Sequence, residues 1–163
     1  MLPIDKIVSG GQTGSDRAGL DWAIAQGIAH GGWCPQGRLA SDGVLPAHYL
    51  LQETESAGYR QRTKRNVQDS DGTLIVNRGE LTGGTLLTQQ LARKLGKPCH
   101  VVAAENGVSD EAAIAVLQWL TDHGIRILNI AGPRESKQAG IYAQTRQILD
   151  SIQLFHNKTQ TRQ

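Results

Sequence analysis

The chain contains the stretch Ile7-Val8-Ser9-Gly10-Gly11-Gln12-Thr13-Gly14-Ser15-Asp16 close to its N-terminus. An apolar run, Ile4 to Val8, leads into it, and apolar positions recur every three or four residues from Leu20 to Gly27 behind it. This pattern predicts a strand, a glycine-rich turn and an amphipathic helix. Exposed N–H groups and the helix dipole at such a turn favour an anion. A tight structural turn with Ser15 as helix N-cap is the alternative interpretation.

The same alternation of short apolar runs and amphipathic segments continues along the chain. We expect strands at 28–33, 73–76, 99–104 and 125–131, helices at 59–67, after 84, after Ser109 and at 139–155, and a long loop at 34–50. Alternating strands and helices indicate an α/β, Rossmann-like fold: a mostly parallel sheet with helices on both faces, in a single domain. We place this ligand-binding domain at residues 1–156 and a frayed polar tail at 157–163.

Three glycine-containing turns, 10–14, 79–84 and 132–136, each follow an expected strand and precede a helix. In open parallel sheets, ligands bind outside the carboxyl ends of the strands, so all three turns belong to one rim. The first turn matches neither the phosphate-binding loop that ends in Lys-Ser/Thr nor the GxGxxG fingerprint. The sequence therefore predicts an anion-binding rim without specifying a nucleotide.

The other two turns have structural alternatives. Leu81-Thr82-Gly83-Gly84-Thr85 repeats the paired glycines and flanking hydroxyls of the first turn, but an ordinary strand-to-helix turn explains it equally well. Arg134, in the third turn, either clamps a phosphate or oxyanion or pairs with Glu135. The basic run from Arg60 to Arg65 is either a solvated helix face or the wall of a groove for an anionic ligand.

Composition excludes several classes of function. Seventeen basic and fifteen acidic residues give a net charge of +2, which is too balanced to indicate nucleic-acid binding. Cys34 and Cys99 form no CxxC, and the five histidines show no ligand spacing, so we assign no residue to a metal. For Cys34 a buried thiol is favoured over contact with a soft metal centre. With no signal region and no apolar run long enough for a bilayer, we expect a cytoplasmic protein that does not contact membranes.

Longer segments resemble a known family. These are Gly10-Gly11-Gln12-Thr13-Gly14-Ser15-Asp16-Arg17-Ala18-Gly19-Leu20-Asp21, Gly31-Gly32-Trp33-Cys34-Pro35-Gln36-Gly37-Arg38, Arg62-Thr63, Asn66-Val67-Gln68-Asp69-Ser70-Asp71-Gly72-Thr73-Leu74 and Leu81-Thr82-Gly83-Gly84-Thr85. Together they are similar to the molybdenum cofactor carrier proteins over residues 4–155, within the Rossmann-like group that includes lysine-decarboxylase-like nucleotide phosphoribohydrolases and nucleotide-sensing domains.

The resemblance implies a carrier that binds and protects the molybdenum cofactor, a phosphate-bearing pterin, for transfer to recipient molybdoenzymes. It also implies a homo-oligomer, often a tetramer. On this interpretation the ligand-binding residues lie in the glycine-rich turns, and three arginines are weaker candidates for binding the anionic ends of the cofactor. They are Gly10, Gly11, Gln12, Thr13, Gly14, Thr82, Gly83, Gly84 and Thr85, together with Arg38, Arg78 and Arg134.

Two other functions remain open. One is a nucleotide phosphoribohydrolase, whose second turn resembles PGGxGTxxE and ends in a catalytic glutamate. In this chain Thr88 stands where that glutamate falls, and the proline before the glycines is missing, since Thr82 precedes Gly83. A threonine hydroxyl is no general acid or base near neutral pH, so we expect a binding protein and not an enzyme. The other is a nucleotide-sensing module, for which this sequence offers no fused effector segment.

Overall fold

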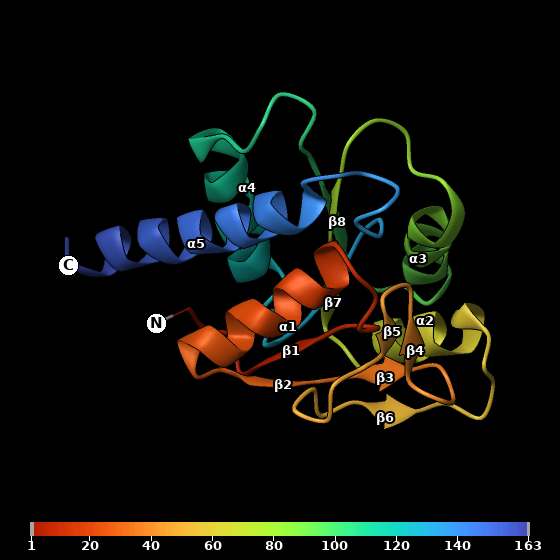
Figure 1. Cartoon of the computed structure of the whole chain (residues 1–163). Coiled ribbons are helices and arrows are strands. Elements are labelled where there is room, and N and C mark those ends of the chain that lie inside the picture. Colours follow the sequence, from red (N-terminus) through yellow and green to blue (C-terminus); the bar gives the residue numbers. More distant parts are fainter. Residues whose placement is uncertain (1, 163) are drawn as a thin grey trace.

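The computed structural model describes residues 2–162 and has a parallel five-stranded sheet at its centre (Figure 1). The strands lie in the order β2-β1-β9-β7-β8, all parallel. Their bounds are β1 Lys6–Val8, β2 Ala29–Gly31, β7 Gly72–Asn77, β8 Cys99–Ala103 and β9 Ile127–Ala131. β7 is buried along its whole length, as expected for a strand covered by helices on both faces. The predicted α/β, Rossmann-like architecture is confirmed.

Five helices cover the sheet in two layers (Figure 1). Their bounds are α1 Ser15–Gln26, α2 Tyr59–Gln68, α3 Gly83–Lys94, α4 Asp110–Asp122 and α5 Ile141–Gln160. α5 packs between α1 and α4 on one face, and α2 packs against α3 on the other. Trp22, Leu74 and Ile130 are among the fully buried side chains of the main core. None of the helices within residues 2–162 is long and apolar enough to cross a membrane.

The segment between α1 and α2 differs from the prediction. The expected strand at 28–33 is split at Gly32 into β2 and a short β3 (Trp33–Cys34), and β3 pairs with β6 (Gln52–Glu53) outside the main sheet. Gly32 has a φ of +118°, and a Cβ there would collide with the Ser9 carbonyl oxygen. The expected loop contains a small hairpin, β4 (Leu39–Ala40) with β5 (Gly43–Val44).

The N-terminal ends of α4 and α1 show where the local sequence predicted the capping residue correctly and where it did not. Ser109 caps α4, its side chain accepting a hydrogen bond from the Ala112 N–H, as predicted. Ser15 does not cap α1: Gly14 is the N-cap residue, and the Ser15 hydroxyl donates instead to the carbonyl of Val76. The Ser15 hydroxyl, which the local sequence predicted to cap α1, therefore binds the carboxyl end of β7 instead.

The C-terminal helix is longer than expected. α5 continues to Gln160, so residues 157–160 are helical. Figure 1 shows this end of α5 projecting past α4 and away from the sheet. The side chains of residues 157–162 are exposed, so this last part of the helix has little to pack against.

The order of the strands positions the site. The chain runs from β1 outward to β2 on one side and from β7 outward to β8 on the other, and β9 returns between β1 and β7. Such a change of direction opens a crevice at the carboxyl ends of the central strands. The turns that follow β1, β7 and β9 therefore meet at one place.

Candidate functional site

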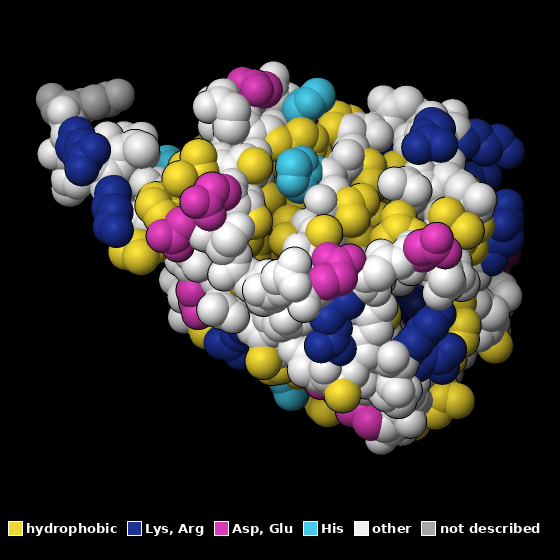
Figure 2. Space-filling view, turned by 90° about the horizontal axis from the view of Figure 1, so that it is seen from above, with side chains coloured by type: hydrophobic (Ala, Val, Ile, Leu, Met, Phe, Trp, Pro, Cys, Tyr) yellow, Lys and Arg dark blue, Asp and Glu magenta, His cyan; other side chains and the backbone are white. Residues whose placement is uncertain are grey.

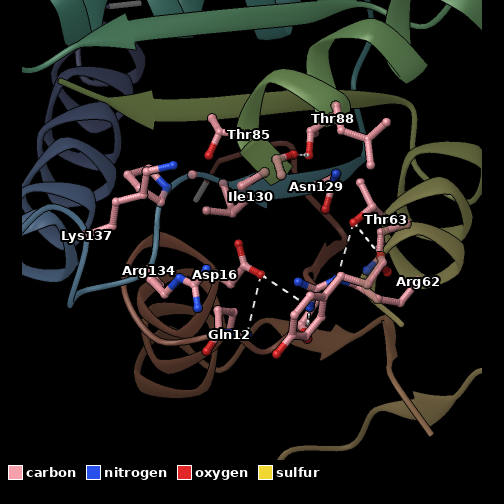
Figure 3. Close-up of a pocket in the computed structure, with 18 residues that line it drawn as sticks. Gln12, Asp16, Arg62, Thr63, Thr85, Thr88, Asn129, Ile130, Arg134 and Lys137 are labelled. Carbon is pink, nitrogen blue, oxygen red and sulfur yellow. Dashed lines mark hydrogen bonds and ion pairs between the residues drawn. The ribbon is translucent and has the colours of Figure 1, made fainter. Parts of the chain in front are cut away.

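A pocket of about 130 Å³ lies at this crevice (Figure 3). Its lining includes Gly10 from the first glycine-rich turn, Gly84 and Thr85 from the second, and Gly132 and Arg134 from the third. The prediction that the three turns share a rim agrees with this placement. Sites for small molecules usually enclose roughly 300–1,000 Å³, so the pocket holds one part of such a ligand while the rest lies in its open mouth.

The start of α3 presents backbone donors to the pocket. Among the described residues, no acceptor faces the N–H groups of Gly83, Gly84 and Thr85. Gly84 and Thr85 line the pocket, and no atom lies within 4 Å of where a Cβ on Gly84 would stand. Free amides at a helix N-terminus, combined with the helix dipole, form an anion-binding position.

The first glycine-rich turn uses its amides differently. The Gly11 N–H donates to the Ser9 hydroxyl, the Gln12 N–H to the Asp16 carboxylate and the Thr13 N–H to the side-chain oxygen of Gln12. These amides are therefore satisfied within the protein. We expected this turn to cradle an anion, but only Gly10 and Gln12 of residues 10–14 line the pocket.

The remaining residues of the first turn serve packing. Gly14 has a φ of +82°, and a Cβ there would lie 2.8 Å from the Glu135 nitrogen and would collide with the Pro133 carbonyl oxygen. A Cβ on Gly11 would lie 2.8 Å from Leu45 and from Leu51. The hydroxyl of Thr13 accepts a hydrogen bond from the Glu135 N–H. This turn therefore joins α1 to the third turn and to the loop before α2.

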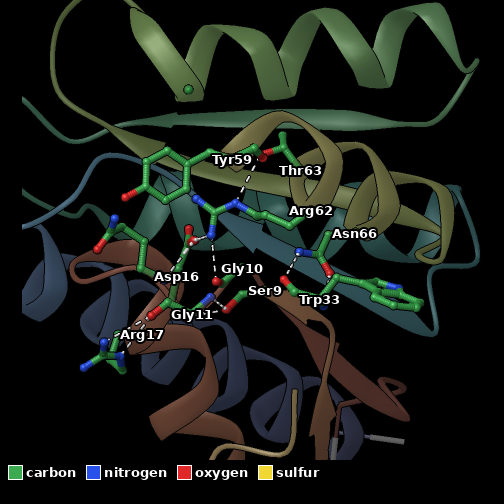
Figure 4. Close-up of polar contacts among 12 residues, drawn as sticks. Ser9, Gly10, Gly11, Asp16, Arg17, Trp33, Tyr59, Arg62, Thr63 and Asn66 are labelled. Atoms are coloured by element: carbon green, nitrogen blue, oxygen red, sulfur yellow. Dashed lines mark hydrogen bonds and ion pairs between the residues drawn. The ribbon is translucent and has the colours of Figure 1, made fainter. Parts of the chain in front are cut away.

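Arg62 enters the pocket from α2 (Figure 4). Its guanidinium donates to the carbonyl of Gly10 at 2.7 Å and lies 3.8 Å from the carboxylate of Asp16. Its side chain is only 11% exposed. A Cβ on Gly10 would collide with the Arg62 guanidinium, so this glycine is required for the close approach of an arginine.

Asp16 is a buried carboxylate in the wall of the same pocket. Burial raises its pKa to about 6, against the opposing effect of the Arg62 and Arg17 guanidinium groups and of backbone N–H groups. The raised pKa means that the negative charge is costly to keep at neutral pH. Buried groups of this kind are enriched at functional sites, because elsewhere a neutral residue is more stable.

Positive charge dominates the lining. Arg62, Arg134 and Lys137 line the pocket together with the single carboxylate of Asp16, a balance of +2 when Asp16 is ionised. Lys137 donates to the Thr82 hydroxyl at 2.7 Å, beside the start of α3. Arg134 makes no ion pair among the described residues, and Glu135, its expected alternative partner, accepts from the backbone of Gly140 and Tyr142. Figure 2, which is seen from above relative to Figure 1, shows Lys and Arg side chains beside a hollow on this face of the molecule.

The structure does not bring two predicted arginines to the pocket. Arg38 donates to the carbonyls of Leu51, Pro46 and Tyr49 and so holds the loop before α2. Arg78 donates to the carbonyl of Ala139. Both guanidinium groups bind backbone carbonyls, which pins them to loops and leaves neither in the lining.

The structure places Thr88 in the pocket lining and Cys34 in a buried apolar cluster. Thr88 lines the pocket, one turn after Gly84, and its hydroxyl donates to the Gly84 carbonyl. Cys34 is fully buried in a small apolar cluster with Leu20 and Leu45, and burial raises the pKa of its thiol. Within residues 2–162, no group of three His, Cys, Asp or Glu side chains is placed to hold a metal ion.

Sequence reasoning missed Asp16 and Lys137 as members of the site, and it raised Arg62 only within the basic run from Arg60 to Arg65, as one of two alternatives. Asp16 and Arg62 stood inside the segments that carried the family resemblance, which was the available signal. Lys137 follows the third turn and carries no motif. Its place beside α3 depends on the fold of residues 132–140 against a helix far away in sequence.

The comparisons with known proteins cover nearly the whole chain. The model of the family described as "Circularly permutated YpsA SLOG family" matches residues 7–153. A solved structure from Syntrophus aciditrophicus SB, described as a putative molybdenum carrier protein, is 46% identical in sequence and superposes with a TM-score of 0.90. The match covers 93% of this chain and 96% of that one. None of the curated proteins searched matches this chain.

Proposed function

Because the chain belongs to the circularly permutated YpsA SLOG family, we propose that it is a carrier that binds the molybdenum cofactor, a phosphate-bearing pterin, and releases it unchanged to a recipient molybdoenzyme. One observation carries the proposal: free amides at the start of α3 face a pocket with a charge balance of +2. A phosphate monoester has a charge of about −1.5 to −2 near neutral pH, which matches that balance. The description of the Syntrophus relative as a putative molybdenum carrier protein supports the molybdenum part of this cargo.

In this proposal the phosphate lies against the N–H groups of Gly83 to Thr85, between Lys137 and Arg134. Charge-assisted hydrogen bonds of this kind are stronger than neutral ones. The small volume of the pocket leaves the larger part of the cargo in its open mouth. The described residues offer no cluster of metal ligands, so the molybdenum is contacted through its oxo groups rather than by protein ligands.

Thr88 supports a binding protein over a hydrolase, because α3 contributes no carboxylate to the pocket. Asp16 is the observation that favours the second candidate function, hydrolysis of nucleoside monophosphates. A buried carboxyl with a pKa of about 6 is suited to proton transfer near neutral pH. The two functions differ in whether the ligand leaves intact.

The test is to purify the chain from cells that make the cofactor and to analyse what comes with it. We expect molybdenum by elemental analysis and a pterin by fluorescence after oxidation, in similar amounts. Incubation with nucleoside monophosphates should release no free base. Release faster than about one turnover per second, the low end of typical enzyme rates, would contradict the carrier proposal and support the hydrolase.

We also propose a cytoplasmic homo-oligomer, as in the first interpretation of the sequence. Closed symmetric assemblies are common among proteins of this kind. Light scattering at low micromolar concentration should give a mass of at least two chains. A mass near 17.6 kDa, with and without the pterin phosphate, would contradict this part of the proposal.

A further inference from the structure

Asp16 is the one carboxylate among the described residues that line the pocket. Its side chain is 10% exposed. One of its oxygens, Oδ2, accepts from the Gln12 N–H at 3.4 Å and faces Arg62 at 3.8 Å. Figure 3 shows both of these interactions leaving the same oxygen, while the carboxylate is directed into the pocket. A carboxylate has about four acceptor sites on its two oxygens, so Asp16 keeps acceptor capacity for a ligand beside its contacts with Arg62 and with the N–H groups of Gln12 and Gly10.

Arg62 does not neutralise Asp16 fully. The short hydrogen bond of its guanidinium goes to the Gly10 carbonyl, at 2.7 Å, and its contact with Asp16 is longer than a hydrogen bond. The carboxylate therefore keeps its charge at a cost, without a bidentate partner. A buried charge is stabilised when a donor pairs with it, so the bound ligand is the natural source of that donor.

A phosphate cannot be that partner, because two negative groups repel strongly in a buried site. The ligand's anionic group belongs at the α3 end, with Lys137 and the free amides. The group that lies against Asp16 must instead donate hydrogen bonds. The pocket is therefore divided into an end for an anion and an end for an N–H donor.

On the basis of the proposed function, we infer that Asp16 accepts hydrogen bonds from the ring N–H and the exocyclic amino group of the pterin's 2-amino-4-oxo-pyrimidine edge. Two parallel N–H donors match the two oxygens of a carboxylate, as a guanidinium does. Adenine presents one amino group beside a ring nitrogen lone pair, and that lone pair would face a carboxylate oxygen. Asp16 is thus a specificity-determining residue for this donor edge, which guanine shares with the pterin and adenine lacks.

The experiment compares two ligands that differ at that edge alone: 6-hydroxymethylpterin phosphate and its lumazine analogue, which has a 2-oxo group in place of the 2-amino group. Calorimetric titration at pH 7.5 should give at least tenfold tighter binding of the pterin. A site built to bind a donor rejects an analogue that lacks it, since a buried acceptor is then left unpaired. Asp16→Asn should reduce the preference to threefold or less.

Asp110→Asn is the matched control. Asp110 is also an acidic residue in the first turn of a helix, is exposed, and lies outside the pocket. It should keep the full preference for the pterin. Circular dichroism and thermal melting establish whether each variant is folded.

Each outcome decides the inference. Equal affinity of the wild type for the two phosphates would overturn the role of Asp16 and leave the proposed function standing. Failure of both phosphates to bind would overturn both. A folded Asp16→Asn variant that still prefers the pterin tenfold would also overturn the inference. If this variant fails to fold, the preference of the wild type alone decides.

Discussion

The first and second glycine-rich turns look alike in sequence and differ in the structure. Both have paired glycines, flanking hydroxyls and a helix start. In the first turn, the amides of Gly11, Gln12 and Thr13 are satisfied within the protein. In the second, the amides of Gly83 to Thr85 face the pocket without an acceptor among the described residues. A glycine-rich turn therefore indicates a close approach of the backbone, and only the partners of its N–H groups show whether a ligand makes that approach.

Valine substitutions at Gly14 in the first turn and Gly84 in the second should show the largest difference between the two turns. Gly14→Val places a branched side chain at a φ of +82° against the backbone of Pro133 and Glu135. Strain of this kind and overpacking each cost about 1–3 kcal/mol, so we expect a loss on the order of 4 kcal/mol in the free energy of unfolding. Urea denaturation followed by circular dichroism measures it.

Gly84→Val is the control for that variant. Gly84 has no positive φ, and nothing lies within 4 Å of its Cβ position, so stability should change by less than about 1 kcal/mol, as for most open sites. Its affinity for pterin phosphate should fall, because the new side chain lies among the free amides. If Gly14→Val is as stable as the wild type, the first turn is not the packing element described above.

Lys137 tests the anion end of the pocket. Lys137→Met removes the ammonium group that lies beside Thr82 at the start of α3. A hydrogen bond to a charged group contributes about 1.5–3 kcal/mol, so the affinity for pterin phosphate should fall roughly tenfold to a hundredfold. Calorimetric titration measures the change.

Lys94→Met is the matched variant, because Lys94 is exposed in the last turn of the same helix. It should bind the pterin phosphate like the wild type. Equal losses in the two variants would mean that Lys137 acts only through the overall charge of the molecule.

The raised pKa of Asp16 makes the stability of the folded chain depend on pH. Because the pKa of Asp16 is raised to about 6 in the folded chain, the folded state holds its proton more tightly than the unfolded state does. Stability is unaffected below pH 4, falls as the pH rises from about 4 to 6, and stays lower above that. Asp16→Asn removes this loss, so the ligand-free variant should gain on the order of 3 kcal/mol relative to the wild type as the pH rises from 4 to 7.

Denaturation at several pH values measures this gain. The charged groups around Asp16 are Arg62 from α2 and Arg17 from α1, with Arg134 and Lys137 elsewhere in the pocket lining. In Asp110→Asn, which changes an exposed carboxylate, the difference from the wild type should stay nearly flat. A flat difference for Asp16→Asn as well would show that Asp16 is not held in a costly charged state.

The fold was predictable where local signals were enough. The alternation of strands and helices, the Ser109 cap and the rim of turns all follow from short segments of sequence. The position of β9 between β1 and β7 was not predictable, since it depends on pairing between distant segments. Gly32 split a predicted strand because the backbone of Ser9, far away in sequence, lies against it.

The candidate site was predictable only in part, for the same reason. The glycine-rich turns indicated where the pocket lies, but not which amides are free. Arg38 was as plausible a ligand as Arg62, and the difference lies in partners: Arg38 binds the carbonyls of its own loop, while Arg62 crosses to Gly10. Lys137 had no local signal. Which side chain reaches a pocket is thus decided by long-range packing.

The central claim is that the ligand's phosphate binds the start of α3 and not the turn after β1. Titrating ¹⁵N-labelled protein with pterin phosphate and following the backbone amide resonances tests it most directly. We predict large, saturable shifts for the amides of Gly83, Gly84 and Thr85, and small ones for Gly11 and Thr13, whose N–H groups are already bonded. Large shifts at Gly11 and Thr13, with the amides of Gly83 to Thr85 unmoved, would contradict the account.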